Sequence, residues 1–180
     1  MKQIIETTRL RLVPCELENI WEIDALWTNP FVRRFLFDNR TIYFDETRSF
    51  IEASSETFIK YGYGIWLIRG RENHRLVGFA GLFKKEGEEM PNLLYGLHPD
   101  CCRQGYAAES AQGVLEYIFD VLGFPLMKAD VDEQNAASVR VLQRLGMRET
   151  KREISGGNRL LHFETTRAEH LLKKHRVQAA

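Results

Sequence analysis

The stretch PNLLYGLHPDCCRQGYAAES, residues 91–110, decides the fold of this chain. Its apolar first half is typical of a strand, and Pro99 ends strand pairing because proline has no N–H to give to the ladder. The loop that follows opens directly onto a helix. Gly105 and the small Ala107 let the backbone approach a ligand closely, and the helix turns free N–H groups and its positive dipole end toward that ligand. The order strand, loop, helix therefore predicts an anion site suited to a pyrophosphate.

Downstream of this loop, the pattern predicts alternating helices and strands. Apolar positions recur at helical spacing from Gly105 to Leu122, and Gly123 is a natural left-handed cap. LMKADVD (126–132) is expected to be a strand, and a second helix is expected from Asn135 as N-cap to Gly146. Two strands should close around residues 156–158 as a hairpin, and the capping-box pattern of residues 166–169 should begin a last helix.

Upstream of the loop, the chain reads as a strand followed by helices and then more strands. Residues 9–13 alternate like a half-buried strand, residues 20–27 repeat at helical spacing, and residues 29–38 look like a short helical turn. Asp45 is the expected N-cap of a helix that ends near Gly62. Two aromatic and β-branched runs on either side of residues 70–74 predict an antiparallel hairpin.

Together these elements predict one α/β domain, residues 1–180. A mixed, mostly antiparallel sheet of about seven strands should be flanked by helices. Its one parallel crossover should join residues 91–99 to residues 126–132, and ligands are expected to bind there.

Composition narrows the class of protein. The 25 basic and 25 acidic residues balance, so the overall charge does not favour nucleic acid or an anionic membrane. No stretch resembles a signal peptide or a membrane span, and three cysteines without a C-x-x-C pair suit a reducing cytoplasm. No metal site is expected: the histidines at positions 74, 162, 170 and 175 lack ligand spacing and are assigned to the surface or to packing.

The pattern YGLHPDCCRQGYAAES, followed by DEQNAASVRVLQRLGM, resembles the acetyl-CoA-dependent N-acetyltransferases of the GNAT superfamily. TTRLRLVP near the start, NPFVRRFL, the G-F-A-G-L of residues 78–82 and the N-x-x-S of residues 135–138 resemble the ribosomal-protein N-terminal acetyltransferase subgroup. The resemblance implies a GNAT-like sheet that splays at the cofactor-binding strand, with acetyl-CoA as cosubstrate and no metal.

The resemblance also assigns the residues that bind acetyl-CoA. The backbone of Leu97 should pair with the pantetheine arm, and the side chain of Asn135 should contact the same arm as well as cap its helix. Loop N–H groups should hold the pyrophosphate. The residues of that loop are Cys102, Arg103, Gln104, Gly105, Tyr106 and Ala107.

The implied reaction is direct attack of an amine on the thioester, which needs a base for the amine and an acid for the thiolate. Many relatives carry a tyrosine as the acid, but Leu142 stands there, so the N-x-x-S serine, Ser138, is the candidate acid. Relatives often have an acidic base where this chain has Asn92. The base therefore stays open among Tyr95, His98 and Glu153; the two catalytic candidates taken forward are Ser138 and Tyr95.

The sequence leaves several alternatives open. A thiolate of Cys101 or Cys102 could be acetylated first, although no histidine is placed by sequence to activate it. Glu109, in the first turn of the predicted helix, is expected to interact favourably with the positive end of the helix dipole. The acceptor is an amine, either a small molecule or a protein N-terminus, and Arg33 and Arg34 are expected on one wall of its groove. The protein is a monomer or homodimer; the second function considered is a non-catalytic acyl-CoA sensor.

Overall fold

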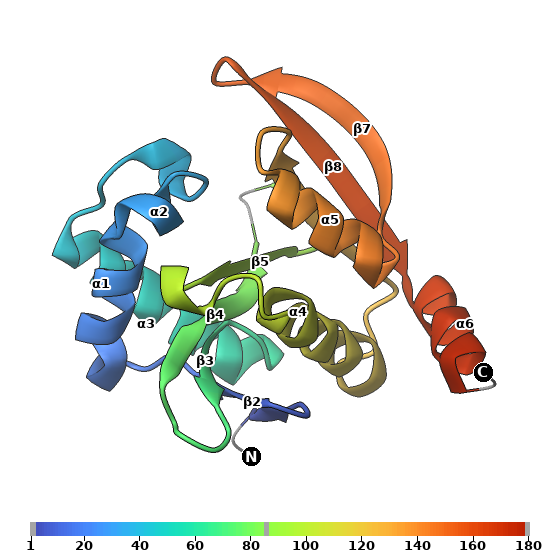
Figure 1. Ribbon diagram of the computed structural model, residues 1–180, viewed down its shortest axis with the longest axis horizontal. Helices are drawn as coiled ribbons and strands as arrows, with labels where there is room; N and C mark the ends of the chain where they lie inside the picture. The colour runs from blue at the N-terminus through green and yellow to red at the C-terminus, as the bar shows by residue number, and fades with distance from the viewer. Residues whose placement is uncertain (1–2, 85–86, 179–180) are drawn as a thin grey trace. The chain divides into compact units, whose positions relative to one another are not determined.

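The computed structural model describes residues 3–84 and 87–178 of the chain. Its strands form a mixed, mostly antiparallel sheet in the order β1-β2-β3-β4-β5-β6-β8-β7, flanked by helices (Figure 1). The described sheet has eight strands rather than about seven, because the two residues of β1 (Ile5–Glu6) also pair with β2. Residues group into two compact units, Met1–Phe83 with Leu94–Val114 and Lys84–Leu93 with Leu115–Ala180. A single domain spanning residues 1–180 stays a prediction.

Unit 1 contains the N-terminal strands and the first helices. Antiparallel pairing joins β2 to β3 and β3 to β4, with Leu12 opposite Ile68 and Leu67 opposite Phe79. The strands of this unit are β1, β2 (Leu10–Pro14), β3 (Ile65–Gly70), β4 (Leu76–Phe83) and most of β5 (Asn92–Leu97). The helices are α1 (Ile20–Thr28), α2 (Pro30–Arg33), α3 (Phe44–Tyr61) and most of α4 (Tyr106–Glu116), with short 3₁₀ turns at Leu17–Asn19, Phe37–Asn39 and Pro99–Cys101.

The start of α3 differs from the sequence prediction. Asp45 is not the N-cap; the helix begins at Phe44, and Tyr43 is the capping residue. The carboxylate of Glu46, at position N3, accepts the Tyr43 amide at 2.8 Å as in a capping box, and the Thr47 amide donates to the Tyr43 carbonyl at 3.1 Å, so helical hydrogen bonding begins two residues before Asp45. The helix ends at Gly62 in the left-handed conformation, φ 79°, as predicted.

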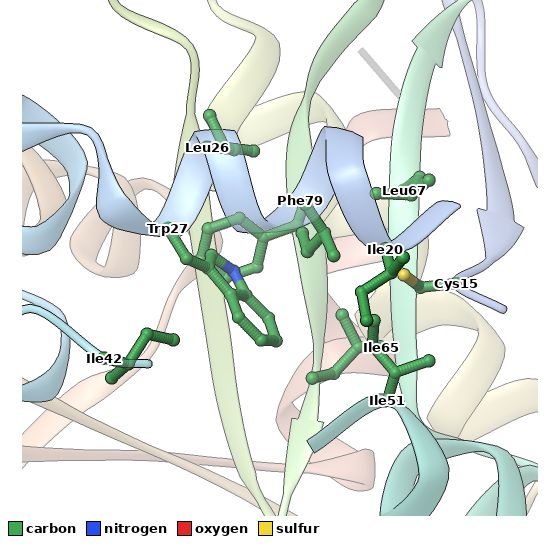
Figure 2. Close-up of a cluster of buried hydrophobic side chains, with 10 residues drawn as sticks. Cys15, Ile20, Leu26, Trp27, Ile42, Ile51, Ile65, Leu67 and Phe79 are labelled. Carbon is green, nitrogen blue, oxygen red and sulfur yellow. The ribbon is translucent and has the colours of Figure 1, made fainter. Parts of the chain in front are cut away.

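Hydrophobic packing in unit 1 centres on Trp27. This side chain projects from α1 toward β4, where its ring meets Phe79 edge-on at a centroid distance of 5.8 Å (Figure 2). Ile20, Ile23 and Leu26 recur on the same face of α1 and are also buried. The helical period of residues 20–27 is thus explained by one buried face.

Unit 2 contains the C-terminal strands and helices. Its strand β6 (Leu126–Asp132) pairs in parallel with β5 and antiparallel with β8 (Asn158–Thr166), and β8 pairs antiparallel with β7 (Arg148–Ser155). The hairpin β7–β8 turns at Gly156 and Gly157, both with positive φ, as predicted (Figure 1). Helices α5 (Ala136–Leu145) and α6 (Arg167–Gln178) complete the unit.

The long helix after the loop changes character near its end. Regular α4 stops at Glu116, and residues Tyr117–Val121 form a wider π-helical turn in which the Leu122 amide donates to the Tyr117 carbonyl. Gly123, φ 72°, follows where a left-handed residue is expected. The wider turn leaves Ile118 and Phe119 fully buried, whereas a 3.6-residue period only predicts a continuous helix.

Candidate functional site

The loop between β5 and α4 has the backbone geometry of an anion-binding nest. Arg103 and Gly105 both have left-handed φ values, 61° and 81°. Left-handed residues in a loop can turn successive backbone N–H groups toward the same side, where they form a concave site for an anion. The Cys102 amide is already donated to the Pro99 carbonyl at 3.2 Å. Among the described residues, no backbone carbonyl accepts from the amides of Arg103 to Ala107, so five N–H groups at the start of α4 remain for a ligand.

Arg9 on the N-terminal side of β2 fastens this loop to the sheet. Its guanidinium donates to the Gln104 carbonyl at 3.0 Å and lies over the Tyr106 ring, 4.5 Å from the centroid. A Cβ added to Gly105 would lie 3.4 Å from the same guanidinium. Glycine is therefore favoured here by the positive φ of residue 105, whereas the Arg9 guanidinium would make only an ordinary van der Waals contact with an added Cβ.

Glu109 connects Arg9 to α4. Its carboxylate accepts from the Thr7 hydroxyl, the Arg9 amide and the Arg9 guanidinium, each at 2.7 Å. Burial opposes ionisation of this side chain, but the hydrogen bonds from Thr7 and Arg9 outweigh burial and lower the pKa of Glu109. The dipole interpretation of Glu109 is incomplete, because its main contacts are with the N-terminal segment. Sequence reasoning missed Arg9 altogether.

Two glycines allow β4 and β5 to approach closely beside Leu97. A Cβ on Gly78 would lie 2.2 Å from the Gly96 carbonyl oxygen, and one on Gly96 would lie 2.6 Å from the Phe79 ring. The His98 amide donates to the Val77 carbonyl at 2.8 Å, which holds the end of β5 against β4. Tyr95 and Leu97 are half-buried and share a face of β5 by strand alternation.

On its other side, β5 pairs with β6 over a short distance. Among the described residues, the two strands align at one pair, Asn92 with Lys128. This pairing belongs to unit 2. The pairing of Leu97 with a pantetheine arm stays a prediction.

Asn135 and Ser138 lie at the start of α5 in unit 2. The Asn135 side-chain oxygen accepts the Ser138 amide at 3.2 Å, which confirms the predicted N-cap. The amide nitrogen of Asn135 can still serve as a donor, so capping and cofactor contact are compatible. Ser138 is half-buried, while Leu142, at the position of the family tyrosine, is buried at 1% exposure. The Leu142 side chain therefore lies on the buried face of α5.

The remaining base candidates have distinct surroundings. His98 caps the 3₁₀ turn, where its Nδ1 accepts the Asp100 amide at 3.3 Å. Glu153 forms an ion pair with Lys151. The hydrogen bond from the Lys151 ammonium is the main cause that lowers the pKa of the Glu153 carboxyl, so this carboxylate is a weaker base. Tyr95 lies on β5 two positions before Leu97, on the same side of the strand, and His98 follows Leu97 directly.

The cysteines are poorly suited to covalent catalysis. Burial is the main cause that raises the pKa of Cys102, with a smaller contribution from Cys101. Burial also raises the pKa of Cys15 to about 12. Because the thiolate is the nucleophile, a raised pKa disfavours an acetyl-cysteine intermediate near neutral pH.

The predicted acceptor wall is partly ordered by its own contacts. Arg33 donates to the Thr41 hydroxyl, while its Nε is buried without a hydrogen-bond partner. Arg34 lies over the Phe35 ring, 5.1 Å from the centroid. Cation–aromatic and hydroxyl contacts of this kind keep both arginines near α2.

Within the described ranges, the chain shows neither a metal-binding cluster nor a membrane-spanning helix. No group of three or more His, Cys, Asp or Glu side chains is arranged to hold a metal ion in residues 3–84 and 87–178. None of the helices in those ranges is both long and apolar enough to cross a bilayer.

Comparison with known families accounts for this arrangement. Residues 9–148 match the Acetyltransferase (GNAT) domain family, which covers the nest, its Arg9 anchor and α5. The chain belongs to the GNAT acetyltransferase family. The GNAT match confirms the fold expected from the sequence motifs.

Curated relatives are distant. This GNAT chain is 27% identical over 108 residues to the uncharacterized protein YkkB of Bacillus subtilis, covering 59% of this chain and 63% of YkkB. It is 26% identical over 147 residues to the uncharacterized N-acetyltransferase YoaA of the same organism, covering 81% and 83%. The chain spans less than two thirds of YkkB, and 46% of a further B. subtilis relative, YnaD.

Solved structures share the fold at low identity. A GNAT-family acetyltransferase from Bordetella pertussis has a TM-score of 0.81 at 21% identity, covering 92% of this chain and 100% of that one. Spermidine N-acetyltransferase from Vibrio cholerae, in complex with CoA and spermine, has a TM-score of 0.77 at 16% identity, covering 90% and 98%. RimL, a ribosomal L7/L12 α-N-protein acetyltransferase in complex with CoA, has a TM-score of 0.78 at 16% identity, covering 91% and 97%.

Proposed function

We propose that this chain is an acetyl-CoA-dependent N-acetyltransferase that transfers an acetyl group directly to a primary amine. The observation that carries the proposal is the nest of Arg103 to Ala107, whose unpaired amides and left-handed residues open onto α4. Backbone N–H groups at a helix N-terminus bind phosphate oxygens without requiring particular side chains. This explains how Cys102 and Gln104 are compatible with a pyrophosphate site.

The proposed reaction uses separate groups for binding and chemistry. The nest holds the pyrophosphate, the backbone of Leu97 and the amide nitrogen of Asn135 hold the pantetheine arm, and Ser138 protonates or stabilises the departing thiolate. Direct attack is favoured over a cysteine intermediate because burial raises the pKa of Cys102. N–H groups on β5 would stabilise the oxyanion that forms at the thioester carbonyl.

The proteins of similar structure indicate which amine acceptors to test first. Spermidine and ribosomal-protein acetyltransferases both share this fold, so a polyamine and a protein N-terminus are the first acceptors to test. The N-x-x-S of residues 135–138 supports the ribosomal-protein subgroup. We place the protein in the cytoplasm as a monomer or homodimer; nucleic acid is not an expected partner, because the chain carries equal numbers of basic and acidic residues.

The test is thiol release from acetyl-CoA in the presence of spermidine, n-butylamine or short peptides with free N-termini. Acceptor-dependent release, with a mass increase of the amine by one acetyl group, supports the enzyme. Ser138→Ala should lower kcat by about tenfold to a hundredfold while leaving the dissociation constant of acetyl-CoA unchanged. Acetyl-CoA binding without turnover for any amine would instead support the sensor function, and absence of binding would exclude both.

A further inference from the structure

A cavity of about 750 Å³ lies at the edge of the unit 1 sheet, between the ends of β1 and β2 and helix α3. Pockets that bind small ligands commonly measure about 300–1,000 Å³, so this space is large enough for a ligand of several residues. Every lining residue belongs to unit 1, and none belongs to the nest of Arg103 to Ala107. The cavity is therefore a candidate site in its own right.

The short pairing of β1 explains why the cavity is open. β1 pairs with two residues of β2, and the described ladder does not continue along Val13 and Pro14. Instead the Gln3 carbonyl accepts the indole N–H of Trp66 at 2.6 Å, and the Gln3 side chain donates to the Phe58 carbonyl at 3.4 Å. Gln3 is thus bonded to β3 and α3 rather than to β2. Pro14 also has no N–H to offer to a further strand, so the end of β2 stays uncovered.

The floor and one wall of the cavity are apolar. Strand alternation places Val13 and Cys15 on one face of β2, where Cys15 belongs to the buried cluster of Figure 2 and Val13 packs at its margin. Ile4 is half-buried beside them in the lining. Ile59 lies on α3 outside the buried stripe of that helix and is 88% exposed. An apolar ligand would remove this surface from water.

Opposite charges lie at the two ends of the lining. The Arg11 guanidinium is 3.6 Å from Glu6, beyond hydrogen-bond distance, and its side chain is 44% exposed. Glu16 is exposed at the other end. The chain between them is extended, because the Cys15 amide donates to the Ile65 carbonyl at 2.8 Å and Glu16 has φ −114° and ψ 166°. Five residues of extended chain separate the two charged residues by about 16 Å.

Two polar side chains of the lining keep hydrogen-bonding capacity for a ligand. The Asn19 side-chain oxygen accepts the Glu16 amide at 3.2 Å, which leaves the Asn19 amide nitrogen as a donor. The Ser55 hydroxyl donates to the Ile51 carbonyl at 3.0 Å, which leaves its oxygen as an acceptor. One donor and one acceptor beside an apolar floor match a peptide group, which carries one N–H and one C=O.

We propose that this cavity binds a short apolar peptide of three residues in extended form, with its carboxylate at Arg11 and its ammonium at Glu16. An extended tripeptide spans roughly 10 Å, and a hydrogen bond of about 3 Å at each end brings the total to about 16 Å. A free amino acid is too short to reach both ends, and a simple apolar amine lacks the carboxylate. Complementary charges at the two ends also fix the direction of the peptide. Binding does not require acetyl-CoA, so this site goes beyond the proposed function.

The test is NMR of the full chain labelled at the isoleucine methyl groups, recorded without acetyl-CoA as trileucine is added. The signals of Ile4 and Ile59 should shift with one dissociation constant, and the variants Ile4→Val and Ile59→Val assign them. Triserine has the same termini without apolar side chains and should bind at least about tenfold more weakly.

Modified peptides test the two ends separately. N-acetyl-trileucine and trileucine amide should each bind roughly twofold to fivefold more weakly than trileucine, the range for exposed ion pairs. Glu16→Gln should remove the penalty of acetylation alone, and Arg11→Gln that of amidation alone, because each variant removes one partner of one pair. Glu18→Gln and Arg48→Gln change exposed residues outside the lining and are the matched controls.

These coupled losses, together with shifts at Ile4 and Ile59, support the site whether or not the protein acetylates any amine. Absence of trileucine binding, equal binding of triserine, or methyl shifts confined to other isoleucines would overturn the inference. So would penalties of acetylation and amidation that persist unchanged in Glu16→Gln and Arg11→Gln.

Discussion

Arg9 and Glu109, separated by 100 positions, are joined by two 2.7 Å hydrogen bonds, one from the Arg9 amide and one from its Nε. The arginine belongs to the N-terminal segment before β2, and the glutamate lies in the first turn of α4. Since Arg9 also binds the Gln104 carbonyl, this pair fixes the loop that is proposed to hold pyrophosphate. Affinity for acetyl-CoA should therefore depend on a residue that need not touch it.

We expect Glu109→Gln and Arg9→Ala to weaken acetyl-CoA binding by roughly threefold to tenfold, because each removes charge-assisted hydrogen bonds that order the nest. Isothermal titration calorimetry gives the dissociation constants. Arg69→Ala is the control, since it breaks the ion pair with Glu22 elsewhere in unit 1. Equal affinity in all three variants would show that the loop keeps its geometry without Arg9.

Gly105→Ala should destabilise the protein by about 1–2 kcal/mol, the cost of left-handed φ for a residue with a Cβ, and should also weaken acetyl-CoA binding. Gly157→Ala is closely matched: φ is 84° at Gly157 and 81° at Gly105, and an added Cβ at Gly157 meets nothing within 4 Å. Urea unfolding should show similar losses for both. Only the Gly105 variant should lose acetyl-CoA affinity, and a similar loss in the Gly157 variant would contradict a local role for Gly105.

His170 should make the protein less stable in mild acid. Burial lowers the pKa of His170, which contacts the Phe119 ring at a centroid distance of 5.0 Å, with Glu116, Asp120, Lys173 and Lys174 as charged neighbours. The folded pKa lies below the unfolded value of about 6.5, so the unfolded chain binds more protons as pH falls below that value. Stability is complete above about pH 6.5 and declines toward the folded pKa, with a slope of at most about 1.4 kcal/mol per pH unit.

The measurement for His170 is the free energy of urea unfolding at about pH 7.5 and 5.5. His170→Phe should reduce the difference between the two conditions, whereas exposed His74→Gln should leave it intact. An unchanged difference in His170→Phe would assign the acid sensitivity to other groups.

Cys102 should react with thiol reagents before Cys15 does. Cys102 is half-buried and its pKa is raised mainly by burial, whereas burial raises the pKa of Cys15 to about 12. At about pH 8 the first modification should map to Cys102 by mass spectrometry, and acetyl-CoA should slow it because the residue adjoins the nest. Cys102→Ser supplies the control; equal labelling with and without acetyl-CoA would place the ligand away from this loop.

Local signals predicted the elements well. The periodicity of residues 20–27, the N-cap Asn135 and the left-handed Gly146 all act within one or two helical turns, and each is found in the structure. The start of α3 was predicted wrongly because the Tyr43 carbonyl accepts the first helical hydrogen bond, from Thr47, two residues before Asp45. The π-helical turn at Tyr117–Val121 could not be predicted from the spacing of apolar residues, which indicates only a continuous helix.

The sequence by itself determined the order of strands and helices and the strand–loop–helix unit around Gly105, because periodicity, caps and turn residues act over a few neighbouring positions. Tertiary structure decided which distant side chains meet. Arg9 reaches Glu109 through the packing of unit 1, and Asp130 meets His162 through the register of β6 against β8. A shift of that register by one residue would send His162 to the opposite face of the sheet. Such pairings depend on strand alignment across many residues, which no local pattern specifies.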